Sequence, residues 1–230
     1  MAIELVIFDI AGTIIHDRGE VSEAFVEALA RHHLNISADD VLEWKGAGKR
    51  AVIRYLLGRT GQIPDDVTVE LIHDDFVAAL NSRYICGALQ AIEGAEAAFD
   101  ALQHLGLKLA VITGFGVSTM RLILETLEWS SYFPVQVSTE QVTNGRPAPD
   151  MIFEAMQQLG ILDPRHVANI GDTPLDLQSA AAARVALNIG VLSGMHTRER
   201  LAREPHTHLI NSVADLPTLL SHSHKPHFAG

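Results

Sequence analysis

Short apolar runs alternate with helical patterns along most of this chain, and their order predicts the class of fold. The first run, Ile3–Phe8, is rich in β-branched residues and ends at Asp9, which is typical of a buried strand. Similar runs occur at 107–112, 135–137, 166–170, 185–189 and 208–210. Helical patterns lie at 94–105, 117–128, 149–159, 174–183, 197–203 and 213–220. Strands that alternate with helices in this way predict an α/β fold with a parallel sheet.

A long segment without a strand pattern follows the first strand. Its first helix, expected over 21–34, has one apolar face, which consists of Val21, Ala24, Phe25, Ala28 and Leu29. Ser37, three residues before Asp40, predicts the N-cap of a second helix. Helices are also expected over 49–57 and 65–80. The segment is therefore predicted to be helical throughout.

These patterns divide the chain into a core and an insertion. The first strand must belong to the same sheet as the later ones, because a lone apolar strand has no other partner. We therefore expect residues 1–14 and 91–230 to form the core and residues 15–90 to form an inserted helical unit. The polar end of the chain, 221–230, is expected to be a flexible tail.

Composition and charge exclude several classes of protein. Hydrophobic residues make up 47% of the 230 residues and charged residues 20%, which excludes an intrinsically disordered chain. Lys and Arg number 17 against 28 Asp and Glu, so the net charge of 17 − 28 = −11 argues against a nucleic-acid partner.

The expected cellular context follows from the cysteine count and the apolar runs. The one cysteine, Cys86, cannot form an internal disulfide, which favours a reducing compartment. The first ten residues have no basic region, so they do not resemble a signal peptide. No apolar run approaches the ~18 residues that cross a bilayer. We expect a cytoplasmic protein without a membrane partner.

Polar residues that suit phosphoryl chemistry follow the predicted strands. In open parallel sheets, ligands bind beyond the carboxyl ends of the strands. The residues expected at that edge are Asp9, Gly12, Thr13, Thr113, Gly114, Arg146, Asp172 and Asp176. Carboxylates of Asp9 and Asp172 are hard oxygen ligands for Mg²⁺. Amides of the 9–13 turn, the Thr113 hydroxyl and the Arg146 guanidinium could bind phosphoryl oxygens.

Each of these residues alone also has an ordinary structural explanation. Asp172 could be a turn or N-cap residue, Asp176 a solvated helix carboxylate and Arg146 a surface charge. Gly114-Phe115-Gly116 is too short a motif to indicate a nucleotide site. The occurrence of all of them in order at successive strand ends favours a single phosphoryl site.

The order of these residues resembles the haloacid dehalogenase superfamily of phosphohydrolases. The four motifs of that superfamily correspond here to FDIAGTI, VITGF, NGRPAP and GDTPLD. The resemblance implies a Rossmann-like core, a helical cap between the first two motifs, and an aspartyl phosphate on Asp9. It also implies that Mg²⁺ is held by Asp9, the Ala11 carbonyl and Asp172, with Asp176 orienting that set, and that Thr113, Gly114 and Arg146 bind the phosphoryl group.

Two departures from the general motifs resemble the phosphonatase-like hydrolases of this superfamily. The second aspartate of the first motif is replaced by Ala11, and the basic residue of the third motif is Arg146 in a G-R-P-A-P setting. The run 190–217 also resembles that group. In the superfamily the missing aspartate is the general acid–base, a role worth about 10²–10⁴-fold in rate. A P–C substrate can dispense with it if an amine first turns the leaving carbon into an enamine.

Lys49 is the candidate amine. Phosphonatases carry a cap lysine in a stretch resembling M-G-x-x-K-x-x-H, and residues 45–52 here read KGAGKRAV. Gly46 and Lys49 match this stretch, whereas Lys45 replaces the methionine and Val52 replaces the histidine that would assist proton transfer. Nearby cationic side chains would lower the pKa of Lys49 and favour its role as a nucleophile. Alternatively, Lys45 and Lys49 belong to a solvated basic edge that attracts an anion.

We therefore expect a Mg²⁺-dependent hydrolase with catalytic residues Asp9, Lys49 and Arg146 that cleaves a P–C bond of a small phosphonoaldehyde-type metabolite. One alternative is a phosphatase for a small phosphate monoester such as phosphoglycolate. Another is a phosphate-binding regulatory protein without turnover. His32 or His33 could supply the missing acid, and Trp44 could line the cap side of the site or pack between cap helices. A homodimer is implied by the resemblance alone.

Overall fold

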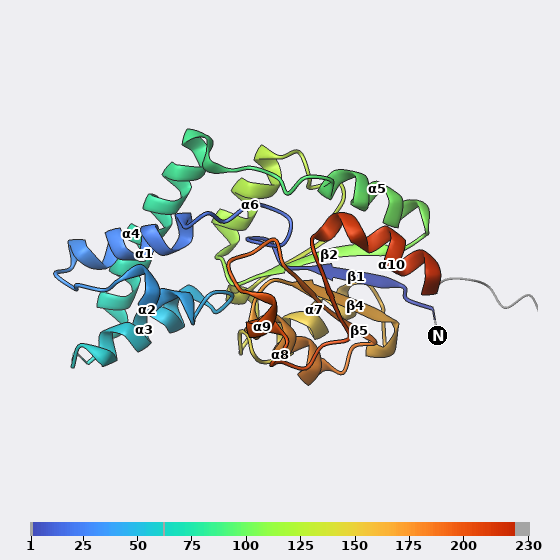
Figure 1. Cartoon of the computed structure of the whole chain (residues 1–230). Helices are drawn as coiled ribbons and strands as arrows, with labels where there is room; N and C mark the ends of the chain where they lie inside the picture. Colours follow the sequence, from blue (N-terminus) through green and yellow to red (C-terminus); the bar gives the residue numbers. More distant parts are fainter. Residues whose placement is uncertain (1, 62, 224–230) are drawn as a thin grey trace, which may run out of the picture.

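A parallel β-sheet forms the centre of the protein (Figure 1). The computed structural model describes residues 2–61 and 63–223. Its sheet has the strand order β3-β2-β1-β4-β5-β6, and every pair is parallel. The strands are β1 (Leu5–Phe8), β2 (Lys108–Thr113), β3 (Val135–Ser138), β4 (Val167–Gly171), β5 (Leu187–Val191) and β6 (His208–Ile210). The predicted α/β, Rossmann-like fold is thereby confirmed.

Helices cover both faces of this sheet, and the first strand shows why its sequence is apolar throughout. Val6 and Phe8 of β1 belong to a hydrophobic cluster that includes Phe99 of α5, whereas Leu5 and Ile7 belong to a second cluster on the other face. The helices of the core are α5 (Ala95–His104), α6 (Val117–Thr126), α7 (Asp150–Gln158), α8 (Pro174–Ala183), α9 (Arg198–Leu201) and α10 (Leu216–Ser223). A strand between two helical layers has no polar face.

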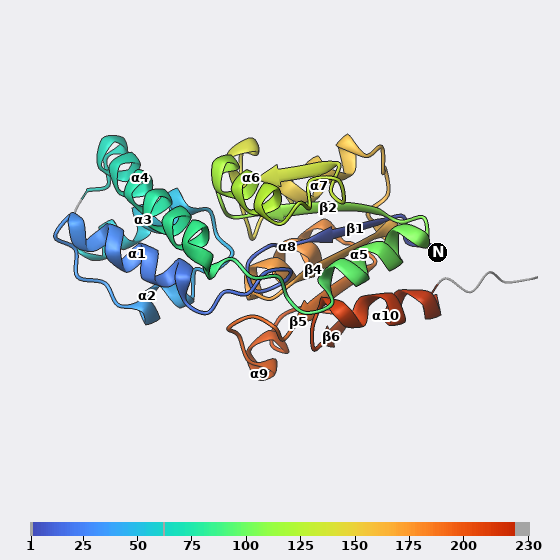
Figure 2. The same cartoon turned by 90° about the horizontal axis from the view of Figure 1, so that it is seen from above.

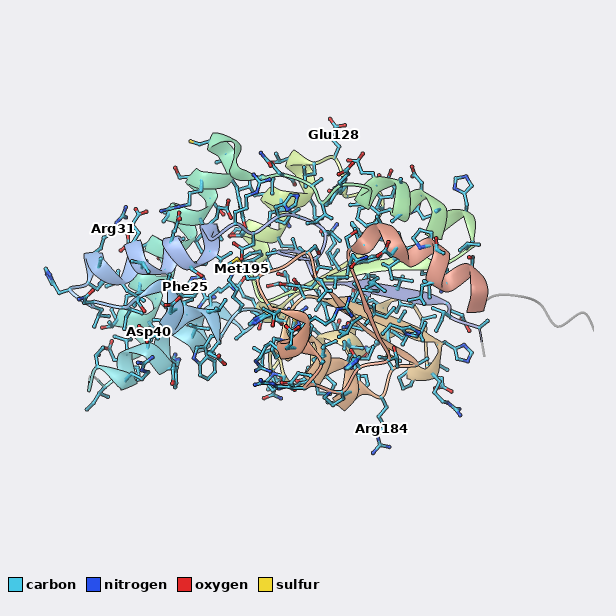
Figure 3. All side chains as sticks on the ribbon, viewed as in Figure 1. Phe25, Arg31, Asp40, Glu128, Arg184 and Met195 are labelled. Carbon is cyan, nitrogen blue, oxygen red and sulfur yellow. The ribbon has the colours of Figure 1, made fainter. Side chains whose placement is uncertain are left out.

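Four helices form a separate block at the end of the sheet where the strands point (Figures 1 and 2). We call this unit the helical block; it consists of α1 (Glu20–Arg31), α2 (Ala38–Leu42), α3 (Lys49–Arg59) and α4 (Asp66–Arg83). All five side chains of the predicted apolar face of α1 are buried. Phe25 among them lies inside the block (Figure 3), with its ring 4.3 Å from that of Phe76. Ser37 caps α2, as predicted.

Two chain segments connect the helical block to the sheet, and they pair with each other. Ile15 and Ala91 form an antiparallel bridge. The amide of His16 donates to Gln90 O at 2.8 Å, and the amide of Ile92 donates to Ile14 O at 2.9 Å. After α4, a π-helical turn (Tyr84–Ala88) leads into the returning segment. The block therefore enters and leaves the core at one place, directly after β1.

The end of the chain departs in part from its prediction. Residues 221–223, expected in a flexible tail, continue helix α10, whose preceding residues Leu216 and Leu220 are buried against the core. The remainder of the expected tail, 224–230, lies outside the described residues. None of the helices formed by the described residues is long and apolar enough to cross a bilayer.

Candidate active site

The site lies where the strand order reverses. From β1 the chain first builds β2 and β3 on one side, and it then returns to build β4 on the other side of β1. The register places Phe8, the last residue of β1, beside Val111 and Ile170, so β2 and β4 end within two residues of the end of β1. Crevices at such reversals are the usual ligand sites of open α/β sheets. Asp9 and Asp172, which follow β1 and β4, are thereby brought to one point.

Three carboxylates form a buried cluster at this point. Acidic oxygens of Asp9, Asp172 and Asp176 all lie within 4.8 Å of one another, and each residue is at most 4% exposed. Asp176 is fixed by a capping box at the start of α8, where it accepts hydrogen bonds from the Thr173 hydroxyl at 2.5 Å and the Thr173 amide at 3.0 Å. The hydroxyl of Thr13 donates to Asp172 at 3.2 Å.

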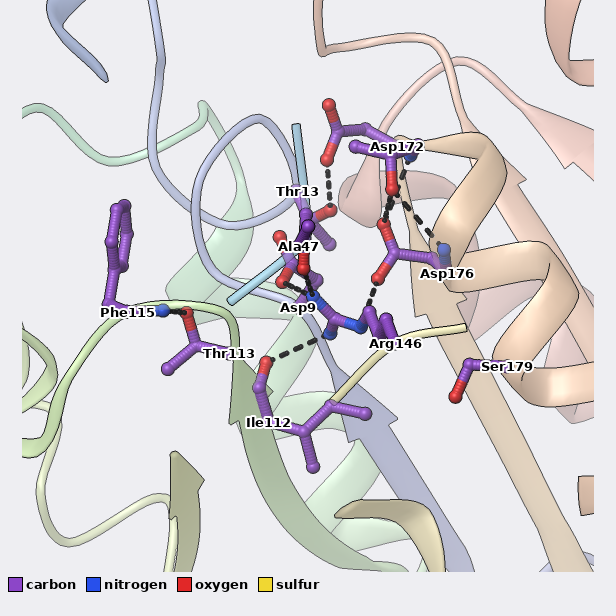
Figure 4. A network of polar contacts seen from close by, with 12 residues as sticks. Asp9, Thr13, Ala47, Ile112, Thr113, Phe115, Arg146, Asp172, Asp176 and Ser179 are labelled. Carbon is purple, nitrogen blue, oxygen red and sulfur yellow. Dashed lines mark hydrogen bonds and ion pairs between the residues drawn. The ribbon is translucent and has the colours of Figure 1, made fainter. Parts of the chain in front are cut away.

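Arg146 lies beneath this cluster and contacts two of its members, Asp9 and Asp176 (Figure 4). Its Nη1 donates to Asp9 Oδ1 at 2.7 Å, and its Nε forms an ion pair with Asp176 Oδ1 at 2.9 Å that is not aligned as a hydrogen bond. Its Nη2 donates to Ile112 O at 3.2 Å. The side chain is fully buried, which rules out the surface-charge alternative. In this conformation Arg146 positions Asp9.

Burial and mutual repulsion raise the pKa values of Asp9 and Asp172 in this cluster. Burial is the main cause that raises the pKa of Asp9 to about 7, against the opposing effect of Arg146. Burial, followed by the charges of Asp9 and Asp176, raises the pKa of Asp172 well above its usual value. Asp9 Oδ2 and Asp172 Oδ2 accept no hydrogen bond from the described residues. Hard, closely spaced and incompletely paired oxygens fit a Mg²⁺ ion, which would relieve the repulsion.

The turn after β1 departs from one expectation. The amides of Gly12 and Thr13 were expected to bind phosphoryl oxygens, but they donate to Ile15 O at 2.7 Å and to Ile10 O at 3.3 Å. These two amides are not free to bind a ligand, because each is hydrogen-bonded to a carbonyl group of the same turn. The requirement for glycine at position 12 is steric: its φ is +86°, and a β-carbon there would overlap the carboxylate of Asp172.

Gly194, in the loop after β5, is a site residue that sequence reasoning missed. A β-carbon on Gly194 would overlap the carboxylate of Asp172 from another direction. The neighbouring Ser193 hydroxyl donates to Gly12 O at 2.7 Å, which holds this loop against the first turn. Asp172 thus fits between two glycines. The G-V-L-S-G run alone does not reveal this contact, because it depends on the packing of β5 beside β4.

The helical block contributes the loop between α2 and α3. A β-carbon on Gly114 would lie 2.5 Å from Ala47 O and 2.6 Å from Gly46 O, so this loop packs directly on the end of β2. Arg146 Nη1 also donates to Gly46 O at 3.3 Å. Backbone contacts of this kind leave no room for a side chain at position 114. The loop is therefore held against the carboxyl end of β2, next to Arg146.

Lys49 begins α3 and is buried. It is 5% exposed, its ammonium group donates to Ala47 O at 3.2 Å, and it lies 4.8 Å from the centre of the Phe115 ring. The pKa of Lys49 is lowered to about 8, chiefly by burial, with Asp9 opposing and Arg146 and Lys45 assisting. Arg50, which follows Lys49 in the chain, pairs with Glu70 at 2.7 Å and with Glu140.

Lys45 is buried beside it and already has a counter-ion. Its Nζ donates to Asp17 Oδ2 at 2.5 Å, and the side chains of this pair are 5% and 4% exposed. The alternative of a solvated basic edge is therefore wrong for both Lys45 and Lys49. The two lysines differ in their pairing, since the ammonium group of Lys49 has only a carbonyl group as a hydrogen-bond acceptor among the described residues.

Two cavities meet at Lys49 and Gly114. The inner cavity, about 20 Å³, is lined by the predicted residues Asp9, Ala11, Lys45, Lys49, Thr113, Gly114 and Asp172, together with others. The Thr113 hydroxyl accepts a hydrogen bond from the Phe115 amide at 3.1 Å. The outer cavity, about 510 Å³, lies between the helical block and the loops after β2 and β3. The inner cavity, as it stands, holds about one water molecule, which is less space than a phosphoryl group occupies.

The histidines proposed as the substitute acid are elsewhere. His32 pairs with Asp75 at 2.9 Å, and neither His32 nor His33 lines these two cavities. Trp44 packs on Tyr55, with ring centres 4.3 Å apart, which supports its packing role. The histidine that does line the outer cavity is His73 of α4. The helical pattern of α4 did not distinguish His73 from its neighbours in the helix, because the other side of the cavity is formed by residues of the core.

Replacing Gly114 by alanine should disturb the docking of the block loop. The added β-carbon would meet two backbone carbonyl oxygens, which cannot rotate away. A misplacement of about 1 Å can cost ~10²-fold in rate, so we expect kcat/KM to fall by at least about tenfold. Steady-state phosphate release measures this effect. Gly58→Ala in α3 is the matched control, because nothing lies within 4 Å of its β-carbon; equal losses in both variants would contradict the docking role.

Comparison with known proteins agrees with this geometry. Residues 6–189 match the family of haloacid dehalogenase-like hydrolases, and the chain belongs to this family of enzymes. Within it, the chain is similar to phosphonoacetaldehyde hydrolases. The protein of that name from Bordetella avium is 28% identical over 95% of this chain and 90% of its own length. The one from Bacteroides fragilis is 30% identical over 93% of this chain and 87% of its own length.

A solved structure shows the same fold. The crystal structure of a hydrolase from Pseudomonas syringae superposes with a TM-score of 0.86 at 22% identity, over 95% of this chain and 98% of that one. This likeness extends through the helical block as well as the sheet.

Proposed function

We propose that this enzyme is a Mg²⁺-dependent, phosphonatase-like hydrolase that cleaves the P–C bond of a small phosphonoaldehyde-type substrate. In this proposal, residues 15–90 are a mobile cap on the core of 1–14 and 91–230. One observation carries it: the buried amine of Lys49 lines the same small cavity as Asp9, while Ala11 stands where the family has its acid–base. An amine at that position can activate the leaving carbon, so the proton that the missing carboxylate would donate is not needed.

The reaction begins on Lys49. Its neutral amine adds to the substrate carbonyl carbon, and uptake of one proton from solvent with loss of water leaves a protonated imine. Burial makes this step accessible near neutral pH because it lowers the pKa of Lys49 to about 8. The carbon that bears phosphorus is now adjacent to an electron acceptor.

Asp9 then acts on phosphorus. Its carboxylate oxygen forms a bond to phosphorus while the P–C bond breaks, and the electron pair moves into the imine to give an enamine. No proton is needed on the leaving group at this moment, so Ala11 is tolerated. The enamine carbon takes up a proton, water hydrolyses the resulting imine, and the product aldehyde leaves Lys49 free. Attack of a second water on the aspartyl phosphate releases phosphate.

The remaining residues hold the phosphoryl group and the carboxylates. Asp9 and Asp172, with the Ala11 carbonyl, would hold Mg²⁺, which offsets the negative charge of Asp9 and the phosphoryl oxygens. Asp176 and Arg146 orient these ligands. Thr113 and Gly114 contact the phosphoryl oxygens from the end of β2, and the Lys45–Asp17 pair closes the cap side of the cavity.

A phosphate-release panel tests the proposal. It contains phosphonoacetaldehyde, simpler phosphonates without a carbonyl group, and phosphate monoesters including phosphoglycolate. We expect release from phosphonoacetaldehyde that is lost on chelation and restored by Mg²⁺. Release from monoesters alone would establish the phosphatase alternative in its place.

The imine step should depend on pH in a way that identifies Lys49. The pKa of Lys49 is about 8, so the neutral fraction, about a tenth at pH 7, rises through pH 8 and is nearly complete at pH 9. Trapping of substrate on the enzyme by borohydride should rise with the same midpoint. Peptide mass spectrometry of samples quenched between pH 6 and 9.5 measures it. A midpoint above pH 10, typical of a solvated lysine, would contradict the role of burial.

A further inference from the structure

A buried ion pair, Lys45 with Asp17, lines the inner cavity together with Asp9 and Lys49. Lys45 Nζ donates to Asp17 Oδ2 at 2.5 Å, and the two side chains are 5% and 4% exposed. Lys45 lies in the loop between α2 and α3, and Asp17 lies in the segment between β1 and α1. Removing two charges from water is costly, and apolar residues often replace such a pair without loss of stability. The position of the pair beside the nucleophile therefore indicates a chemical use.

The ammonium group of Lys45 has N–H groups that are not engaged. It carries three N–H donors, and the hydrogen bond to Asp17 is the only one that it makes among the described residues. Burial is the largest cause that lowers the pKa of Lys49, and the charge of Lys45 is a further cause. Burial also raises the pKa of Asp172, and the charge of Lys45 opposes that effect. The ammonium group therefore lies close to the reactive amine and to the carboxylate cluster.

The proposed reaction needs a proton donor in this cavity after the P–C bond has broken. The carbon that carried phosphorus is then the nucleophilic end of a neutral enamine, and it must gain a proton before water can release the aldehyde. At this stage Asp9 carries the phosphoryl group, Lys49 carries the enamine and Asp172 is a metal ligand. Asp17 is the acceptor of the ion pair. The ammonium group of Lys45 is the remaining acid among the described side chains that line the inner cavity.

We propose that Lys45 is the general acid that protonates the enamine carbon and that Asp17 positions its ammonium group. One N–H proton moves to the carbon, the electron pair of the enamine forms the new C–H bond, and a protonated imine on Lys49 results. Lys45 is then a neutral amine, and it regains a proton from the water that adds to the imine carbon. The two steps together consume no proton. This inference rests on the proposed function, because it requires an enamine on Lys49.

Exchange of deuterium into acetaldehyde isolates this step from P–C cleavage. Acetaldehyde is the product expected from phosphonoacetaldehyde, and its imine on Lys49 becomes the same enamine when a methyl proton moves to neutral Lys45. In D₂O the wild-type enzyme should therefore exchange the methyl protons, which proton NMR measures. In Lys45→Ala the exchange rate should fall at least ~10²-fold, as expected for loss of a general acid–base. Borohydride trapping of acetaldehyde on Lys49 should persist, whereas a misfolded site would lose both signals.

Ammonium ions distinguish the proton of Lys45 from its charge. Lys45→Ala leaves space beside the carboxylate of Asp17, and ammonium and potassium ions are similar in size and equal in charge. Only ammonium carries a proton, so ammonium chloride should restore exchange in proportion to its concentration, and potassium chloride should not. Equal restoration by the two salts would overturn the general-acid role, because it would show that Lys45 acts through its charge alone.

A second variant keeps the test decisive if Lys45→Ala does not fold. The double variant Lys45→Met with Asp17→Asn leaves no buried charge without a partner, and it should lose exchange while keeping the trapped adduct. Lys108→Ala is the control, because it removes an exposed ammonium group at the start of β2. It should keep both the exchange rate and the trapped adduct.

The outcomes separate this inference from the proposed function. Wild-type exchange in a Lys45 variant that still traps acetaldehyde would overturn the role of Lys45 and leave P–C cleavage through Lys49 intact. Absence of trapped acetaldehyde or phosphonoacetaldehyde in the wild-type enzyme would overturn the imine on Lys49, on which the proposed function and this inference both depend.

Discussion

An Asp9→Asn enzyme is expected to release phosphate at least about 10⁴-fold more slowly than wild type from every substrate. Asparagine keeps the shape of the side chain and the contact with Arg146, but its amide cannot form an acyl phosphate. Losses of this size are typical when a catalytic nucleophile is removed. Phosphate release under single-turnover conditions, with enzyme in molar excess over substrate, measures the chemical step directly.

The control for Asp9→Asn is the same change at a solvated carboxylate. Asp66, whose side chain is 86% exposed, offers it, and Asp66→Asn should leave the rate unchanged. Melting temperatures of both variants show whether they are folded. A folded Asp9→Asn enzyme with more than a tenth of wild-type activity would exclude nucleophilic attack by Asp9.

Lys49→Arg is expected to reduce phosphate release from phosphonoacetaldehyde by at least about 10³-fold and to abolish borohydride trapping. Arginine keeps the positive charge next to Asp9 but is not nucleophilic at these pH values, since its pKa exceeds 12. The comparison therefore separates covalent chemistry from charge. A lysine that acts only as a counter-charge to the phosphoryl group would tolerate this substitution with a much smaller loss.

Lys108→Arg is the matched control for Lys49→Arg. Lys108 is exposed at the start of β2, where it donates to Leu159 O at 2.8 Å far along the strand from the site. It should keep the wild-type rate. If Lys49→Arg stays within threefold of Lys108→Arg on phosphonoacetaldehyde, no imine forms on Lys49 and the P–C mechanism fails.

The position of the site could be predicted because strand ends are a property of local sequence. The apolar run before Asp9 and the run before Asp172 identify two strands. The rule that parallel strands share a carboxyl edge then brings the two carboxylates together. The same reasoning placed Thr113 and Arg146 at this edge, and the alternation of strands and helices predicted the sheet.

The surroundings of each side chain could not be predicted in the same way. Whether Lys49 is solvated or buried depends on the contact of the block loop with Gly114, and Ala47 of that loop is 114 − 47 = 67 positions from Gly114 in the chain. The engagement of Arg146 by Asp9 and Asp176 likewise needs the fold. Gly194 and His73 lie in segments whose local patterns indicate only a loop and a helix, so their contacts with the site arise from tertiary packing.

The proposed mechanism, in which an amine replaces an acid–base, would explain the unusual first motif. With Ala11, the carboxylate that protonates a leaving oxygen in the family is absent, and neither His32 nor His33 lines the inner cavity to replace it. A leaving carbon stabilised through Lys49 needs no such proton. In the proposed mechanism Lys49 and Ala11 act together, although Lys49 lies in the helical block and Ala11 in the core.

The most direct test of the account is to find the covalent bond between Asp9 and phosphorus. Enzyme quenched in acid during turnover of phosphonoacetaldehyde is reduced with borohydride, which converts phosphorylated aspartate to homoserine, and its peptides are sequenced by mass spectrometry. Homoserine at position 9, absent from samples without substrate, is the result that the account predicts. Homoserine at another carboxylate, or at none while phosphate is being released, would contradict it.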